Sequence, residues 1–85
     1  MLTDKIVRAE EIEELIYDLE QLVERRTLRF LRKIKQYQIE YESGEITEET
    51  LFKRTRLRVE SLAELINGIN YKIEELRFEQ KQFLE

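Results

Sequence analysis

Residues 43–47, with the sequence Ser-Gly-Glu-Ile-Thr, divide the chain into two long stretches that are patterned as helices. Gly44 tolerates the left-handed backbone that ends many helices, and Thr47 is a favoured N-cap for a following helix. Each flanking stretch has roughly 40 residues, and the chain contains no proline that would break either of them. The sequence therefore predicts an all-α antiparallel hairpin of two long helices. We expect a single domain over residues 1–85, with a helix over about 4–42, a turn at 43–47 and a helix over about 48–84.

The first stretch carries an apolar stripe that is wider than the seam of a two-stranded coiled coil. Its members are Ile12, Leu15, Ile16, Leu19, Leu22, Val23, Arg26, Phe30, Ile34, Tyr37 and Tyr41. Such a wide stripe is typical of a helix that contacts more than one neighbour. Arg26 stands where an apolar residue is expected, and two interpretations are open. Its stem packs while its charge reaches water, or it forms a buried ion pair near Glu64 that fixes the register of the helices.

The second stretch has the more regular pattern, with spacings that alternate between three and four residues. Its members are Phe52, Thr55, Val59, Leu62, Ile66, Ile69, Ile73, Leu76, Gln80 and Phe83. Asn67-Gly68 lies inside the pattern without shifting its phase, so we predict one continuous helix. A break at Gly68, which would give a three-helix monomer, is the alternative.

Antiparallel pairing around the turn places residue i near residue 91 − i. Gly68 then faces Val23, and the missing side chain would let the two backbones approach closely. Seven apolar residues flank the seams and would be exposed on a single hairpin: Leu15, Leu22, Leu31, Ile39, Leu51, Leu57 and Leu65. Because an apolar patch of this kind usually marks an interface, we predict a homodimer in which two hairpins form a four-helix bundle or coiled coil. The predicted interface residues are Leu15, Leu19, Leu22, Leu62, Ile66, Ile69 and Ile73, and a different protein as partner stays open.

Charge is strongly segregated along the chain, although the net charge is only −4. Residues 1–24 carry eight acids and two bases, whereas residues 25–39 carry six bases and no acid. Residues 51–58 add four bases and no acid, and residues 60–85 carry six acids and three bases. In a hairpin the two basic segments lie side by side near the turn and form a basic belt. Its ten cations are Arg25, Arg26, Arg29, Arg32, Lys33, Lys35, Lys53, Arg54, Arg56 and Arg58.

Three interpretations of the basic belt are open. It is a solvated face with weak ion pairs, or it recognises the acidic half of an antiparallel second copy. The third interpretation is binding of nucleic-acid phosphates by all of these cations except Arg56. The acidic balance of the whole chain and the lack of a known nucleic-acid motif count against the third interpretation.

The composition argues against most catalysis. Without histidine or cysteine, the chain has no Ser-His or Cys-His pair and no His or thiolate ligand for a metal. The two glycines are too far apart for a phosphate-binding loop, and no apolar run approaches the roughly 18 residues of a membrane span. We therefore expect a non-enzymatic, cytoplasmic protein with no catalytic residue, metal, cofactor or small-molecule substrate. Its expected role is that of a self-associating adaptor or assembly protein, with a small nucleic-acid-binding accessory protein as the alternative.

Overall fold

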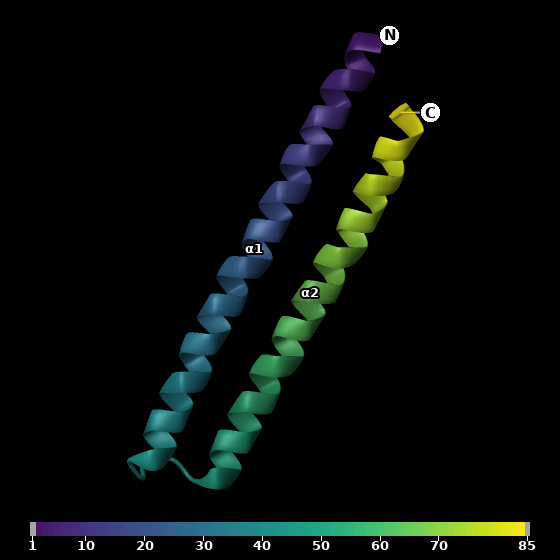
Figure 1. The fold of residues 1–85 in the computed structure, drawn as a ribbon. Coiled ribbons are helices and arrows are strands. Elements are labelled where there is room, and N and C mark those ends of the chain that lie inside the picture. Colours follow the sequence, from purple (N-terminus) through teal and green to yellow (C-terminus); the bar gives the residue numbers. More distant parts are fainter. Residues whose placement is uncertain (1, 85) are drawn as a thin grey trace.

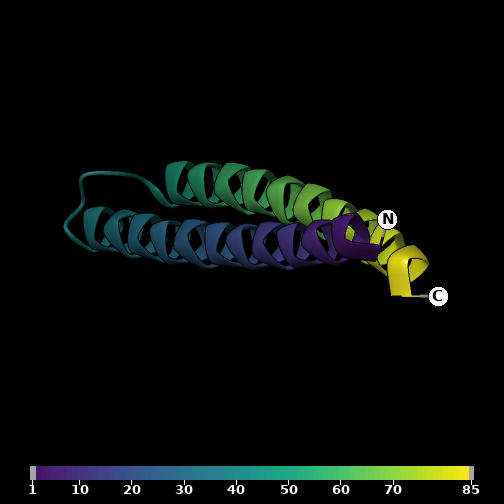
Figure 2. The same ribbon diagram turned by 90° about the horizontal axis from the view of Figure 1, so that it is seen from above.

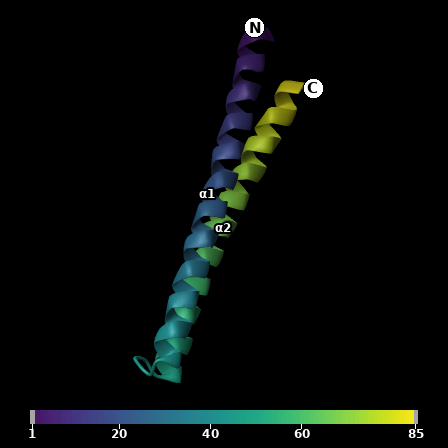
Figure 3. The same cartoon turned by 60° about the vertical axis from the view of Figure 1, so that its left-hand side comes forward.

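The chain folds as a hairpin of two long antiparallel helices. The computed structural model describes residues 2–84, which form α1 (Leu2–Glu42) and α2 (Glu48–Leu84) and include no strand. The helices lie side by side along their length, and the start of α1 and the end of α2 lie at the same end of the hairpin, opposite the turn (Figure 1). Views from two other directions show the same single layer (Figures 2 and 3). The predicted all-α hairpin and both predicted helices are confirmed. None of the described helices is both long enough and apolar enough to cross a membrane.

The turn is built as its sequence predicts. Gly44 has φ +82°, and the amides of Gly44 and Glu45 donate to the carbonyls of Tyr41 and Glu40 at 3.1 and 2.8 Å. This pair of bonds is the Schellman pattern, which satisfies carbonyls at the end of α1 that have no partner within the helix. At the start of α2, Thr47 Oγ1 accepts a hydrogen bond from the amide of Thr50 at 3.2 Å. Gly44 thus sets the C-terminal end of α1, and the N-cap Thr47 sets the start of α2.

α2 runs through Asn67-Gly68 without a break, so the three-helix alternative is wrong. The expected close approach of the backbones at Gly68 is also wrong. Apart from its chain neighbours and the backbone of α2 itself, a Cβ atom built on Gly68 would meet no heavy atom within 4 Å. Gly68 therefore faces away from α1, because its phase on α2 differs from that of the packed residues Leu65 and Ile69 on either side.

The buried core occupies the half of the hairpin that lies away from the turn. Ile12, Ile16 and Leu76 form a buried cluster, against which Leu19, Ile73 and Phe83 pack, and Ile69 is buried as well. None of the described residues from 24 to 61 is buried. The half of the hairpin near the turn therefore depends on helix propensity and half-buried contacts.

Polar contacts between the helices show which residues of α1 and α2 face each other in the antiparallel hairpin. Arg8 donates from Nε and Nη2 to the two carboxylate oxygens of Glu79, each at 3.1 Å, and these bonds raise the pKa of Arg8. Gln80 Nε2 donates to Glu13 at 2.7 Å. Across the cross-helix polar contacts the two residue numbers sum to between 87 and 97, which brackets the predicted 91.

Two residues of the regular α2 pattern lie outside the seam, contrary to the prediction. Phe52 is 73% exposed and Val59 is 49% exposed, whereas Ile66 and Ile73, which continue the same seven-residue spacing, are half-buried. A straight helix rotates by about 20° per heptad relative to a seven-residue repeat, so such a stripe drifts around the helix. The stripe therefore begins on a flank of α2 at Phe52 and reaches the seam at Ile73.

The seven residues expected to flank the seams divide into two groups. Leu15, Leu31, Ile39 and Leu57 are exposed as predicted, but Leu22, Leu51 and Leu65 are half-buried by the other helix. The interhelical contact is therefore wider than a simple a/d seam in these places.

Candidate anion-binding groove

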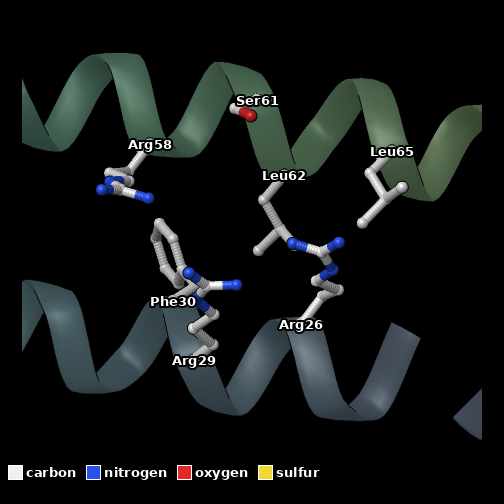
Figure 4. A pocket seen from close by; sticks show the side chains of 7 residues that line it. All are labelled: Arg26, Arg29, Phe30, Arg58, Ser61, Leu62 and Leu65. Carbon is white, nitrogen blue, oxygen red and sulfur yellow. The ribbon is translucent and has the colours of Figure 1, made fainter. Parts of the chain in front are cut away.

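Three arginines surround a shallow groove between α1 and α2. The groove has a volume of about 260 Å³ and is lined by Arg26, Arg29, Phe30, Arg58, Ser61, Leu62 and Leu65. Arg26 and Arg29 reach up from α1 and Arg58 reaches across from α2, so their charged ends enter the space between the helices (Figure 4). Phe30, Leu62 and Leu65 supply the apolar part of the lining. We call these seven residues the arginine groove.

Helical spacing brings these side chains to one side of the hairpin. Arg26 and Arg29 are three residues apart on α1, and Arg58 and Ser61 have the same separation on α2. Side chains with this spacing share a helix face. Lys33 continues the α1 row and Arg54 precedes Arg58 by one turn, so both extend the cationic surface toward the turn.

Arg26 forms no ion pair within residues 2–84, and its side chain is exposed. The interpretation as a buried ion pair near Glu64 is therefore wrong. Figure 4 shows the Arg26 side chain rising from α1 into the groove, with its guanidinium end nearest to Leu62 and Leu65. Because the side chain is exposed, its charge remains hydrated, which explains why an arginine is tolerated within an apolar stripe.

Tyr37 organises the end of the cationic surface that lies nearer the turn. Arg58 Nε donates to the Tyr37 hydroxyl at 3.2 Å, and the Arg54 guanidinium carbon lies 5.7 Å from the centroid of the Tyr37 ring. Arg54 also pairs with Glu40 through Nη1 at 3.3 Å. The apolar stripe predicted for the first helix includes Tyr37 and gives no indication of this role. The only sequence signal is that the residue numbers of Tyr37 and Arg54 sum to 91, which antiparallel pairing predicts for residues that face each other.

Most cations of the basic belt lack an acidic partner. Arg54 pairs with Glu40, and Arg56 pairs with Glu60. Within residues 2–84, no carboxylate lies within 4.0 Å of the other eight. These eight are Arg25, Arg26, Arg29, Arg32, Lys33, Lys35, Lys53 and Arg58. The belt is therefore a concentration of positive charge that the hairpin itself does not neutralise.

The opposite side of the hairpin carries an apolar groove near the turn. It has a volume of about 400 Å³ and is lined by Ile34, Gln38, Leu51, Phe52, Thr55, Arg56 and Val59. Arg56 lines this groove and Arg58 lines the arginine groove, because residues two apart differ by about 200° around a helix. The ten cations of the belt are thus not equivalent, and the two sides of the hairpin differ in chemistry.

The seven predicted interface residues occupy different environments in the single hairpin. Ile69 is buried between the two helices, whereas Leu15 remains exposed. The other five are half-buried: Leu19, Leu22, Leu62, Ile66 and Ile73. Contacts between α1 and α2 thus already cover six of these seven side chains at least in part.

Within the described residues, no cluster of three or more acidic side chains is arranged to hold a metal ion. Glu11 and Glu13 of the acidic N-terminal segment instead contact Arg8 and Gln80. Comparisons of the chain with protein-family models, curated proteins and solved structures find no match. Any functional assignment therefore depends on the physical properties of the two grooves.

Proposed function

We propose that this protein is a self-associating helical assembly module that acts through protein–protein contacts, without catalysis. The observation that supports the proposal is the size of its exposed surface. The hairpin has an accessible surface of 7081 Å², whereas a compact monomer of 10.5 kDa would have about 5,400 Å². The excess of roughly 1,700 Å² per chain is in the range that one subunit buries in an obligate dimer.

The shape of the chain leads to the same proposal. Its radius of gyration is 19.2 Å, against about 12 Å for a compact domain of this length. Two helices in one layer cover only one face of each other, and small domains already bury a low fraction of their surface. Packing a second layer of helices against the first would supply the core that the half near the turn lacks.

We place the centre of the interface at the apolar groove, with a second copy of the chain as the occupant. Phe52 lines this groove and is 73% exposed, and Val59, seven residues later, is 49% exposed. Ile66 continues this row toward the middle of the hairpin, and its half-buried side chain would become fully covered. A two-fold related copy presents the same row, which is how closed dimers of helical hairpins are built.

Other exposed apolar residues, on the back of α1, are less suited to form the dimer interface. Ile6, Tyr17, Leu28 and Ile39 lie on the back of α1 at intervals of eleven residues. Eleven residues span about 16 Å of helix, so these side chains are isolated from one another. Single exposed apolar residues are ordinary on protein surfaces and do not indicate an interface.

Light scattering over a range of concentrations tests the proposal. We expect a mass of about 21 kDa, twice the 10.5 kDa of one chain, and little change in high salt because apolar burial is not screened. Combining Phe52→Ser with Val59→Ser should give a monomer. The matched control combines Tyr71→Ser with Phe78→Ser, since these residues are also seven apart on α2 and are 65% and 66% exposed. A wild-type chain that stays monomeric at all concentrations would overturn the proposal.

A further inference from the structure

The hairpin concentrates cations on one side and, among residues 2–84, leaves most of them without an acidic partner. Arg26, Arg29 and Lys33 form a row on α1, and Arg54 and Arg58 form a row on α2. Only Arg54 pairs with a carboxylate among residues 2–84. We call these five residues the arginine face. Like charges that lie so close repel one another, so an anionic ligand would be favoured on this face.

Contacts with Tyr37 hold part of the arginine face in place before any ligand arrives. The hydrogen bond from Arg58 Nε to the Tyr37 hydroxyl fixes one edge of that guanidinium, and Arg54 lies over the ring. The two Nη groups of Arg58 are not used in the bond to Tyr37. Guanidinium groups present paired donors that match the oxygens of a phosphate, and an oriented side chain loses less entropy when it binds.

The length of the arginine face suits a chain of phosphates better than a single anion. The row from Arg26 to Lys33 extends over about 10 Å of helix, at about 1.5 Å per residue. Along one strand of duplex DNA a negative charge recurs every 3.4 Å or so, hence the row faces about three phosphates. The groove is shallow and open along the helices, with the Ser61 hydroxyl as an additional polar group at its edge.

We propose that the arginine face is a binding site for the phosphate backbone of nucleic acid, independent of base sequence. The face lies on the side of the hairpin opposite the apolar groove, so self-association through that groove leaves it open. Two hairpins joined in this way would present two such faces. This inference therefore goes beyond the proposed self-association and does not depend on it.

Fluorescence anisotropy with a labelled 24-base-pair DNA duplex tests the proposal between 50 and 200 mM salt. The main variant combines Arg26→Gln, Arg29→Gln and Arg58→Gln. Its affinity at 50 mM salt should fall about tenfold or more, and the slope of log affinity against log salt should decrease by about 2.7, at about 0.9 for each phosphate that is no longer neutralised. Duplexes of unrelated sequence should bind equally well, because the contacts involve only the backbone.

The matched control combines Lys35→Gln, Lys53→Gln and Arg56→Gln, which removes three charges from the same two segments but away from the arginine face. We expect the control to lose at most a few-fold in affinity, since only screened long-range attraction is removed. Circular dichroism and light scattering verify that both variants keep the helicity and mass of the wild type. Should the main variant lose helicity, replacing the same three arginines with lysine keeps the charge, and this variant should bind the duplex.

Three outcomes would overturn the proposal. The first is the absence of wild-type binding at 50 mM salt, and the second is equal weakening of the main variant and the control. The third is that labelled poly-glutamate binds as tightly as the duplex through the same three arginines, which would make an acidic protein segment the ligand. None of these outcomes affects the proposed self-association, which is judged by mass alone.

Discussion

Arg58 and Tyr37 connect the two helices through a hydrogen bond of 3.2 Å between Nε and the tyrosine hydroxyl. The same tyrosine ring lies beneath Arg54, so one aromatic side chain contacts two neighbouring cations. Tyr37 supplies a ring and a hydroxyl rather than a cationic group. Its contribution to anion binding is therefore to position the arginines.

Replacing Tyr37→Phe separates positioning from charge. The variant keeps the ring under Arg54 and loses only the hydroxyl, so duplex affinity should fall roughly two- to fivefold, as expected for one modest hydrogen bond. The slope of log affinity against log salt should not change, because every cation that faces a phosphate is still present. The control is Tyr71→Phe, an exposed tyrosine on α2. Unchanged affinity in Tyr37→Phe would show that the tyrosine does not orient Arg58 for binding.

The two glycines should respond in opposite ways to the same substitution. Gly44 has φ +82°, where a Cβ atom is strained, so Gly44→Ala should lower the free energy of unfolding by about 1–2 kcal/mol. Gly68 is helical and has open space around its Cβ position, so Gly68→Ala should raise the free energy by up to about 1 kcal/mol. Urea unfolding at one fixed protein concentration measures both. Destabilisation by Gly68→Ala would mean that a second chain approaches α2 closely at this point.

Stability should depend most on the half of the hairpin away from the turn. Ile16 is 2% exposed and belongs to the buried cluster with Ile12 and Leu76, so Ile16→Ala should cost about 2–4 kcal/mol. The same truncation at Leu28, which is exposed on the back of α1, should cost less than about 1 kcal/mol. The difference is measured by urea unfolding at matched concentration. Equal costs at the two positions would contradict the placement of the core.

The sequence was sufficient to predict the local structure of the chain. Gly44 and Thr47 carry short-range signals, because a left-handed turn and an N-cap depend on only a few neighbouring residues. α1 ends at Glu42 and α2 begins at Glu48, as these signals indicate. Continuity through Gly68 was also predictable, since the apolar phase on either side of it is the same.

The packing of one helix on the other could not be predicted from spacing alone. A seven-residue pattern gives the phase of a stripe, but its drift around a straight helix decides which members meet the neighbour. The spacing predicts that Phe52, Val59, Ile66 and Ile73 all lie in the seam, but of these four only Ile66 and Ile73 reach it. The arginine groove depends on side-chain positions across two helices. For that reason spacing neither indicates the role of Tyr37 nor decides between the two interpretations of Arg26.

Ile66 lies where the apolar row of α2 passes from the exposed flank into the seam, and its side chain is half-buried. In the proposed dimer it would be covered on both sides. Ile66→Asp would place an unpaired charge there, at a cost on the order of several kcal/mol, and should abolish the folded oligomer. Light scattering and circular dichroism measure the loss of mass and helicity. The control is Asn67→Asp, which adds the same charge at the next, exposed position and should retain both. An Ile66→Asp variant with unchanged mass and helicity would mean that this part of the seam stays open to water, and the interface would then lie elsewhere on the hairpin.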